Sequence, residues 1–156
     1  MTLKSFGCSF VFGTELKDTV DNILPHGFSR MTWPALLARR KKYKYISFAK
    51  PGAGNLEIAD TVLSHIEHSV NEFYVIQWTW IDRFDYVNDI APDRITFNRW
   101  KTIHPNDSNE LSEYYFRNLH SQYRDKLSSL IAIKTVVSML QSRNLPFIMT
   151  YVDDLL

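Results

Sequence analysis

The alternation of short apolar runs with helical patterns constrains this chain more than any single motif. The runs lie at residues 2–6, 43–48, 73–78 and 147–152, and they are rich in aromatic or β-branched residues, which is typical of strands. Strand–helix alternation repeated along a chain predicts a parallel sheet with right-handed crossovers. We therefore expect an α/β fold, a three-layer sandwich whose sheet has at least four parallel strands in the order 2-1-3-4.

Helical periodicity fills the gaps between these runs. Pro34 marks the first turn of a helix that begins at Trp33, where a missing N–H costs nothing. A second helix follows the turn at 52–55, and one of its faces carries Ala59, Val62, Leu63, Ile66 and Val70. The longest helix is expected over 121–143, with a main apolar stripe formed by Tyr123, Leu127, Leu130, Ile131 and Val137.

Residues 80–120 interrupt this rhythm. The segment is polar and aromatic, contains Pro92 and Pro105, and has no sustained period apart from a short helix expected over 111–119. A segment of this length without clear regular structure is typical of a functional insertion or lid. We interpret 1–156 as one domain with an insertion at 80–120, whose aromatic side chains either line a cleft or form a surface for self-association.

Composition narrows the class of protein. The 156 residues are 45% hydrophobic, and 18 Lys and Arg oppose 17 Asp and Glu, which gives a formal net charge of +1. A chain with so little net charge is expected to bind neither nucleic acid nor a membrane, and it has no apolar run long enough to span one. The single cysteine, Cys8, excludes an internal disulfide and fits a reducing compartment. We expect a cytoplasmic protein without a signal peptide.

Polar residues gather where the predicted strands end. In an open α/β sheet, ligands bind beyond the carboxyl ends of the strands, at the point where the strand order reverses. This rule places Ser9, the 52–55 turn, residues 79–82 and Asp153 along one edge of the predicted sheet. The convergence of these segments is the main reason to expect a functional site there.

Residues at this edge also have purely structural interpretations. Ser9 is either a turn or N-cap residue after Gly7, or a nucleophile. Cys8, between strand and turn, is interpreted as a small buried filler rather than as a nucleophile. The 52–55 turn either cradles an anion at a helix N-terminus or is a tight turn in which Asn55 caps the helix.

Several motifs in register resemble those of the SGNH (GDSL-like) hydrolases. Gly7-Cys8-Ser9 resembles the Gly-Asp-Ser block of that family, and Trp33-Pro34-Ala35-Leu36-Leu37 resembles the Trp-Pro-x-Leu-Leu at the start of its first long helix. The stretch 47–55 resembles the second block, an Asn-x-(Gly/Ala)-x-x-Gly turn after strand two. Gly-Cys-Ser-Phe together with Pro-Gly-Ala-Gly-Asn looks most like a divergent branch common in phage and environmental sequences.

The resemblance implies a flavodoxin-like sandwich that hydrolyses esters or transfers acyl groups. Ser9 would be the catalytic nucleophile, and the backbone N–H groups of Ser9 and Gly52 would form the oxyanion hole, with Asn55 supplying a side-chain amide. The pocket would be bordered by Cys8, Thr79, Asp82 and Arg83. The substrate would be a small-molecule ester or an acylated sugar, and no cofactor is implied.

The chain also departs from the family pattern. Cys8 replaces the aspartate of the first block, Ser47 replaces the asparagine of the second, and Ile81 stands where the third block carries its oxyanion asparagine. The Asp-x-x-His block that supplies the base of the family does not occur in these 156 residues. We therefore expect either a hydrolase truncated at its C-terminus or a degenerate member whose Ser9 lacks the usual base.

Among the five histidines, only His104 is a candidate replacement base, because the insertion that contains it starts at the expected site edge. No carboxylate or thiolate pattern completes a metal site around these histidines, so no metal is expected. The alternative function is a non-catalytic SGNH-like binding or assembly module, associated with carbohydrate or with a virion. A homo-oligomer is compatible with either function.

Overall fold

A central parallel sheet organises the structure, a computed structural model that describes residues 1–20, 26–66, 71–87 and 99–153. Its strands are β1 (Thr2–Phe6), β2 (Lys44–Ser47), β3 (Glu72–Trp78) and β6 (Phe147–Tyr151), arranged in the order β2-β1-β3-β6. Every neighbouring pair in this sheet is parallel. The predicted order 2-1-3-4 is therefore confirmed, and it is the order that begins flavodoxin-like folds.

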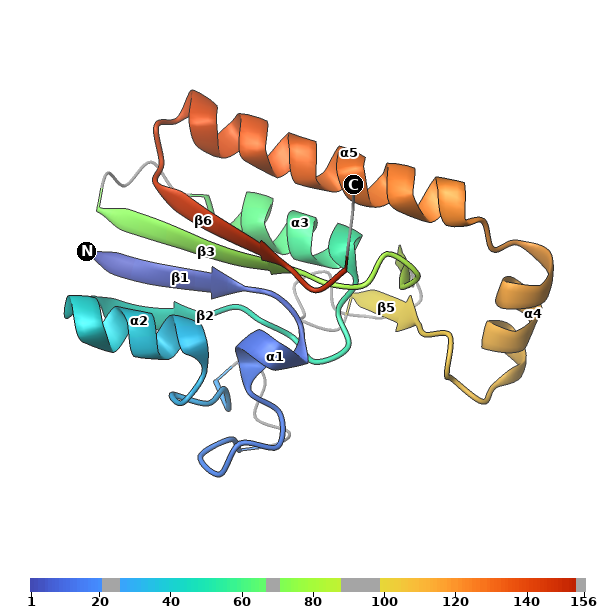
Figure 1. Cartoon of the computed structure of the whole chain (residues 1–156), viewed down its shortest axis with the longest axis horizontal. Coiled ribbons are helices and arrows are strands. Elements are labelled where there is room, and N and C mark those ends of the chain that lie inside the picture. The colour runs from blue at the N-terminus through green and yellow to red at the C-terminus, as the bar shows by residue number, and fades with distance from the viewer. Residues whose placement is uncertain (21–25, 67–70, 88–98, 154–156) are drawn as a thin grey trace.

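Helices cover both faces of the sheet. One face packs against α3 (Asn55–Ser64) and α5 (Gln122–Ser142), and the other packs against α2 (Trp33–Lys41) (Figure 1). The alternation of side chains along a strand explains this division, since successive residues point to opposite faces. The face toward α3 and α5 carries the larger core, whose strand residues are Phe6, Tyr74, Ile76 and Trp78. Leu3 and Val75 point the other way and meet Ala38 of α2.

The buried face of α5 is not the predicted one. Leu127, Leu130 and Ile131 are exposed, at 43%, 39% and 57%, whereas the buried positions are Asp125, Ser129, Ala132, Ile133, Val136 and Leu140. Two polar residues lie on the buried side because they have partners there: Ser129 Oγ accepts a hydrogen bond from the Asn55 amide, and Asp125 pairs with His120. The apolar residues of the sequence therefore pointed to the wrong buried face of α5.

The helix after the 52–55 turn is shorter than its periodicity predicts. It ends at Ser64, and Ile66 packs against the core from beyond the helix. Val70, the last residue of the predicted stripe, lies outside the described residues.

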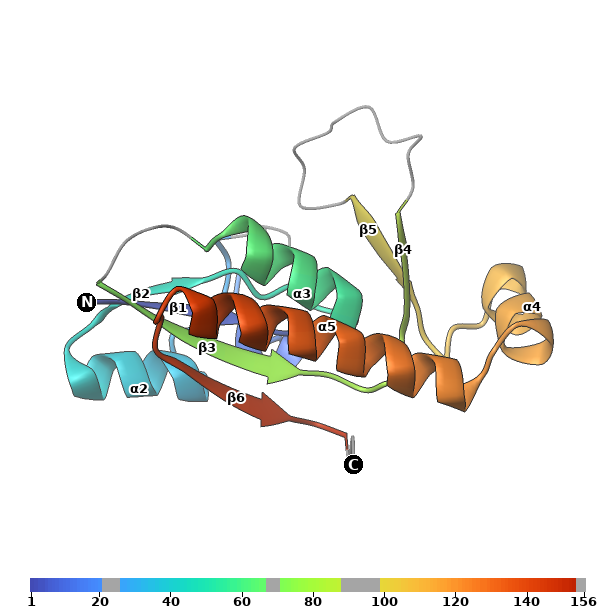
Figure 2. The same ribbon diagram turned by 90° about the horizontal axis from the view of Figure 1, so that it is seen from above.

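The segment 80–120 contains regular structure that the sequence did not reveal. β4 (Phe84–Val87) and β5 (Trp100–Ile103) pair antiparallel as a separate two-stranded sheet, and α4 (Glu110–Asn118) matches the helix expected near 111–119. These elements lie beyond the carboxyl ends of β1 and β3 (Figures 1 and 2). Among the described residues, no helix is long and apolar enough to cross a membrane.

Candidate functional site

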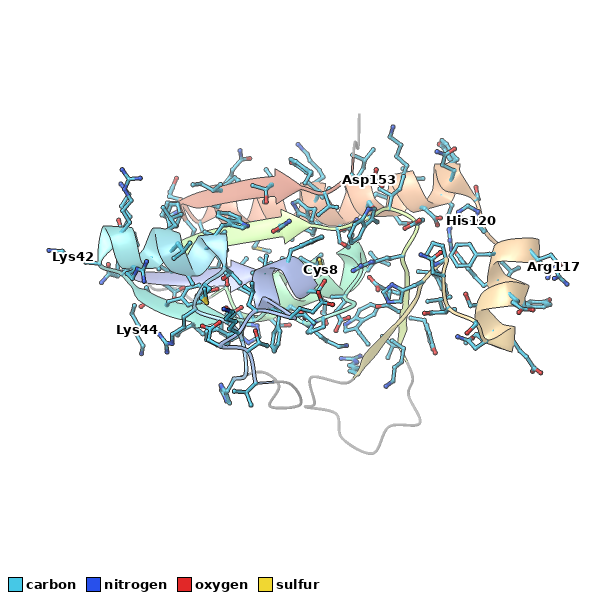
Figure 3. All side chains as sticks on the ribbon, turned by 60° about the horizontal axis from the view of Figure 1, so that its bottom comes forward. Cys8, Lys42, Lys44, Arg117, His120 and Asp153 are labelled. Atoms are coloured by element: carbon cyan, nitrogen blue, oxygen red, sulfur yellow. The ribbon has the colours of Figure 1, made fainter. Side chains whose placement is uncertain are left out.

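Ser9 stands where the prediction placed it, at the carboxyl end of β1. It is the first residue of the short helix α1 (Ser9–Phe12), and Cys8 is the residue that precedes the helix. A Cβ at Gly7 would lie 2.7 Å from Val11 Cγ2 and 3.1 Å from the Gln77 carbonyl oxygen, so glycine permits the tight reversal. Cys8 is completely buried, which fits its interpretation as a filler, and Ser9 is half-buried. Figure 3 shows Cys8 at this end of the sheet.

The turn before α3 lies directly beside this reversal. The Lys50 N–H donates to the Gly7 carbonyl at 3.0 Å, and the Ala53 N–H closes the turn on the Lys50 carbonyl at 3.2 Å. Gly52, between them, has a φ of +82°, a conformation that glycine adopts without strain. The first two predicted segments of the site are therefore neighbours.

Asn55 joins this turn by hydrogen bonds to the third predicted segment of the site, residues 79–82. Its Oδ1 accepts the Thr79 N–H at 2.8 Å, and its Nδ2 donates to the Thr79 carbonyl at 3.2 Å and to Ser129 Oγ at 3.0 Å. Thr79 follows β3, so one amide side chain ties the ends of two loops to α5. Both amide protons of Asn55 thus have acceptors, and one of these bonds must break before Asn55 can donate to an oxyanion.

The N-terminus of α3 is already occupied by a carboxylate of the protein. Asp85 of β4 accepts the Gly54 N–H at 3.1 Å and the Glu57 N–H at 3.0 Å, and it also accepts the Thr102 hydroxyl of β5 at 2.7 Å. Burial raises the pKa of Asp85, and these hydrogen bonds oppose that rise. Because this carboxylate fills the position that an external anion would take, the turn is not an open anion cradle.

This contact brings the β4–β5 hairpin against the candidate site. Glycine at position 54 permits the close approach, since a Cβ there would clash with the Asp85 carboxylate. Trp100 of β5 adds a second tie to α3, because its Nε1 donates to Asp60 Oδ2 at 2.8 Å. The β4–β5 hairpin is therefore fixed to the turn and to α3 by hydrogen bonds at both strands.

His104 follows β5 immediately, and its ring lies beside Gly52. A Cβ built on Gly52 would lie 3.4 Å from His104 Nε2. Burial and the positive charge of Arg83 lower the pKa of His104, so the imidazole is neutral near pH 7. The Asp107 carboxylate accepts the His104 backbone N–H at 2.9 Å, which fixes the loop that carries the ring. The structure thus brings the candidate base to one of the candidate oxyanion donors.

Aromatic side chains and an arginine border the same edge. Phe10, next to Ser9, lies 5.6 Å from Trp80 between ring centroids. The Arg83 guanidinium lies over the Trp80 ring at 4.7 Å, and its Nη1 donates to the Ala53 carbonyl at 2.8 Å. These contacts connect the start of α1 to the 52–55 turn through the loop after β3.

Asp82 and Asp153 belong to a different hollow. They line it together with Ile81, His120, Gln122, Asp125 and Lys126. The Asp153 carboxylate accepts the Ile81 N–H at 3.2 Å, and burial together with the Asp153 charge raises the pKa of Asp82. His120 and Asp125, 3.0 Å apart at Nε2 and Oδ2, are in this hollow, and Figure 3 shows His120 and Asp153 on the side of α5. The positive charge of Arg83, the neighbour of Asp82 in sequence, acts on Asp82 in the opposite direction and lowers its pKa.

Sequence reasoning missed a buried ion pair under the turn. Lys50 Nζ lies 2.6 Å from Glu57 Oε1, and Lys50 also donates to the Trp100 carbonyl at 3.0 Å. Burial raises the pKa of Glu57 to about 7, against the opposing effect of Lys50. The spacing of Lys50 and Glu57 across a glycine-rich turn was the available signal, but only the fold shows that both are withdrawn from water.

A metal centre is not formed by the described part of the chain, where no three His, Cys, Asp or Glu side chains are grouped to hold an ion.

No family model matches the sequence, and no curated protein matches it. A solved structure from Desulfitobacterium hafniense DCB-2, assigned to the G-D-S-L family of lipolytic proteins, is similar at 12% identity with a TM-score of 0.49. The alignment covers 95% of this chain and 57% of that one, so this chain spans little more than half of its length.

Proposed function

We propose that this chain carries the site of an SGNH-type serine acyl hydrolase, an esterase in which Ser9 is the nucleophile. The observation that supports the proposal most is the placement of His104 against Gly52, at the edge where Ser9 begins α1. These 156 residues contain no Asp-x-x-His block, and this imidazole reaches the same edge from the end of β5 instead. A family resemblance in three motifs supports the same function.

In the proposed reaction, His104 accepts the proton of the Ser9 hydroxyl while Ser9 Oγ bonds to the carbonyl carbon of the ester. The negative charge that develops on the carbonyl oxygen is met by the backbone N–H groups of Ser9 and Gly52, each such donor being worth about 10²–10³ in rate. The imidazolium then protonates the leaving alcohol, and water releases the acyl group from Ser9 by the reverse sequence.

The electrostatics of His104 suit a base. Its lowered pKa keeps the ring unprotonated near pH 7, so a nitrogen lone pair is available. Within the described residues the Ser9 hydroxyl makes no hydrogen bond, so the imidazole has to move from Gly52 toward Ser9 as substrate binds. Catalytic hydrogen bonds commonly tighten only in the substrate complex.

A fluorophosphonate probe tests this assignment. We expect the wild-type chain to be labelled on Ser9, Ser9→Ala to remain unlabelled, and His104→Gln to slow labelling by about 10²–10⁴-fold. His120→Gln is the matched control, because His120 lies in the other hollow, and it should label at the wild-type rate. A folded wild-type protein that is never labelled would refute the hydrolase.

A non-catalytic SGNH-like module is the second candidate. It is favoured by the Asn55 side chain, whose amide protons are both used to hold Thr79 and Ser129. Such a module, associated with carbohydrate or with a virion, would leave the probe unreacted and would bind glycans through aromatic residues such as Phe10 and Trp80. Glycan-array binding without labelling would establish it.

The proposal also includes the finer expectations from sequence. These are a phage-type branch of the family, a cytoplasmic setting that keeps Cys8 reduced, and a small ester or acylated sugar as substrate without a cofactor. The reading frame downstream of codon 156 tests whether a longer gene product carries an Asp-x-x-His block.

A further inference from the structure

The guanidinium of Arg83 is held rigidly at the edge of the candidate site. The Trp80 ring supports one face of it at 4.7 Å, and the Ala53 carbonyl accepts one of its N–H groups at 2.8 Å. A cation over an aromatic face is stabilised by the ring, and a planar guanidinium fixed at one nitrogen keeps its other donors in a defined direction. Arg83 is half-buried, so this geometry is maintained within the fold and not on an open surface.

Arg83 differs from the buried lysines in that it forms no ion pair with a carboxylate of the described residues. Lys4 and Lys50 each lie 2.6 Å from a glutamate, Glu72 and Glu57 respectively. Among the residues that the structure describes, no carboxylate forms an ion pair with Arg83. The adjacent Asp82 is close enough for the Arg83 charge to lower its pKa, but it lines the hollow shared with Asp153. A half-buried arginine that is oriented by two contacts and has no ion-pair partner in the described part of the chain fits an external anion, since planar bidentate binding of carboxylates is the particular strength of this side chain.

The position of Arg83 relates it to the reaction. The carbonyl that it holds belongs to Ala53, next to Gly52, and its charge acts on His104, whose pKa it helps to lower. An anion bound to Arg83 would therefore lie beside the proposed oxyanion donor and base. Arg83 offers one positive charge, and the helix N-terminus nearby is already taken by Asp85. A singly charged carboxylate matches this environment better than a phosphate dianion.

We infer that the site accepts esters that carry a second, ionised carboxylate, and that Arg83 binds this carboxylate. The inference deepens the proposed hydrolase and rests on it for the reacting ester, but the anion contact itself does not require turnover. Arg83 is then a specificity-determining residue.

The test uses monoethyl succinate and its uncharged counterpart, diethyl succinate. Binding is measured by calorimetry at low ionic strength with the full chain carrying Ser9→Ala, so that no hydrolysis occurs. We expect the monoester to bind about 10- to 100-fold more tightly, the worth of a charge-assisted hydrogen-bonded pair. Adding Arg83→Gln should remove this preference and Arg83→Lys should keep part of it. Lys44→Gln should leave it intact, because Lys44 begins β2 at the amino-terminal edge of the sheet, whereas Arg83 follows the carboxyl end of β3.

Equal binding of the two esters, or a preference that survives Arg83→Gln, would overturn the inference. If Arg83→Gln does not fold, Arg83→Lys still decides, because an unchanged preference in that variant would exclude a bidentate contact. Hydrolysis by the wild-type chain separates the two claims. A binding preference without hydrolysis of either ester would refute the hydrolase and leave the anion site. Equally efficient hydrolysis of both esters would support the hydrolase and refute the anion site.

Discussion

Lys50 and Glu57 form a buried ion pair under the turn that holds Gly52. The protonation of Glu57 makes the stability of the protein depend on pH. The Glu57 side chain is 5% exposed, and its Oε2 has no hydrogen-bond partner among the described residues. Burial raises its pKa from 4.5 to about 7, and the negative charges of Asp85 and Asp60 act in the same direction against Lys50. Folding therefore favours the protonated carboxyl group.

Glu57→Gln should flatten the pH dependence of stability. In the wild-type chain the contribution of Glu57 is fully present below pH 4.5 and is lost as the pH rises through about 7, because the unfolded chain ionises first. A shift of this size corresponds to roughly 3 kcal/mol in the free energy of unfolding. Urea titrations between pH 4 and 8 would measure it.

Two controls apply to this prediction. Asp82 and Asp85, whose pKa values are also raised, leave a residual slope of stability against pH in the variant. Glu113→Gln, at an exposed position, should keep the wild-type dependence of stability on pH. An unchanged slope in Glu57→Gln would contradict the assignment.

The contact between Gly54 and Asp85 gives a second prediction at this scale. Gly54→Ala should lower the free energy of unfolding by about 1–3 kcal/mol, because the new Cβ displaces the carboxylate that caps α3. In an Asp85→Ala background the same change should cost much less, since the clashing group is gone. Urea unfolding of the four chains in this cycle measures the coupling, and additive costs would exclude the proposed clash.

The β4–β5 hairpin carries several residues of the candidate site. Asp85 and Trp100 tie it to the turn and to α3, Thr102 of β5 holds the Asp85 carboxylate within the hairpin, and His104 follows its second strand. Gly54→Ala should therefore also loosen the hairpin, which hydrogen exchange would show as faster exchange of the described β4 and β5 amides while β1 and β3 keep their protection. Equal loss of protection in all four strands would indicate global unfolding instead.

Helix α5 allows a matched comparison of its two faces. Ile133 is 8% exposed and Ile131 is 57% exposed, although the sequence pattern placed Ile131 in the buried stripe. Ile133→Ala should cost about 2–4 kcal/mol of unfolding free energy through cavity formation, and Ile131→Ala should stay within about 0.5 kcal/mol. Chemical denaturation of both variants measures this difference. The reverse order of costs would mean that α5 is rotated about its axis.

The distribution of charge over the whole molecule bears on its partners. The exposed basic residues at the end of α2 and the start of β2, among them Lys42 and Lys44, lie at the end of the molecule remote from Cys8 (Figure 3). Basic residues at a helix C-terminus are favourable for the helix itself. The basic run is thus separated from the candidate site.

We expect no retention on immobilised duplex DNA at 150 mM salt. With a formal net charge of +1 the molecule has no extended positive field, and few phosphates would be neutralised by one short run. Elution measured over a salt gradient tests this. Tight retention with a steep salt dependence, abolished by Lys42→Gln with Lys44→Gln, would reverse the expectation.

Local sequence signals predicted the strands, the sheet order and the position of Ser9. Residues 2–6 form a strand over the bounds expected, and β3 and β6 differ from expectation by one residue at an end. These features are predictable because an apolar run defines a buried strand and because crossover handedness limits the order in which such strands pair. Local sequence patterns therefore account for the sheet and for the edge at which the candidate site lies.

Contacts between remote segments determine which residues meet at that edge. Asp85 reaches Gly54 across 31 positions and His104 reaches Gly52 across 52, and no local pattern encodes such contacts. The same applies to α5, where apolar residues occur on both sides and the buried side carries Ser129, whose partner Asn55 lies 74 positions away. Hydrogen bonds between remote segments, formed where water is excluded, set these choices, and they leave no periodic trace in the sequence.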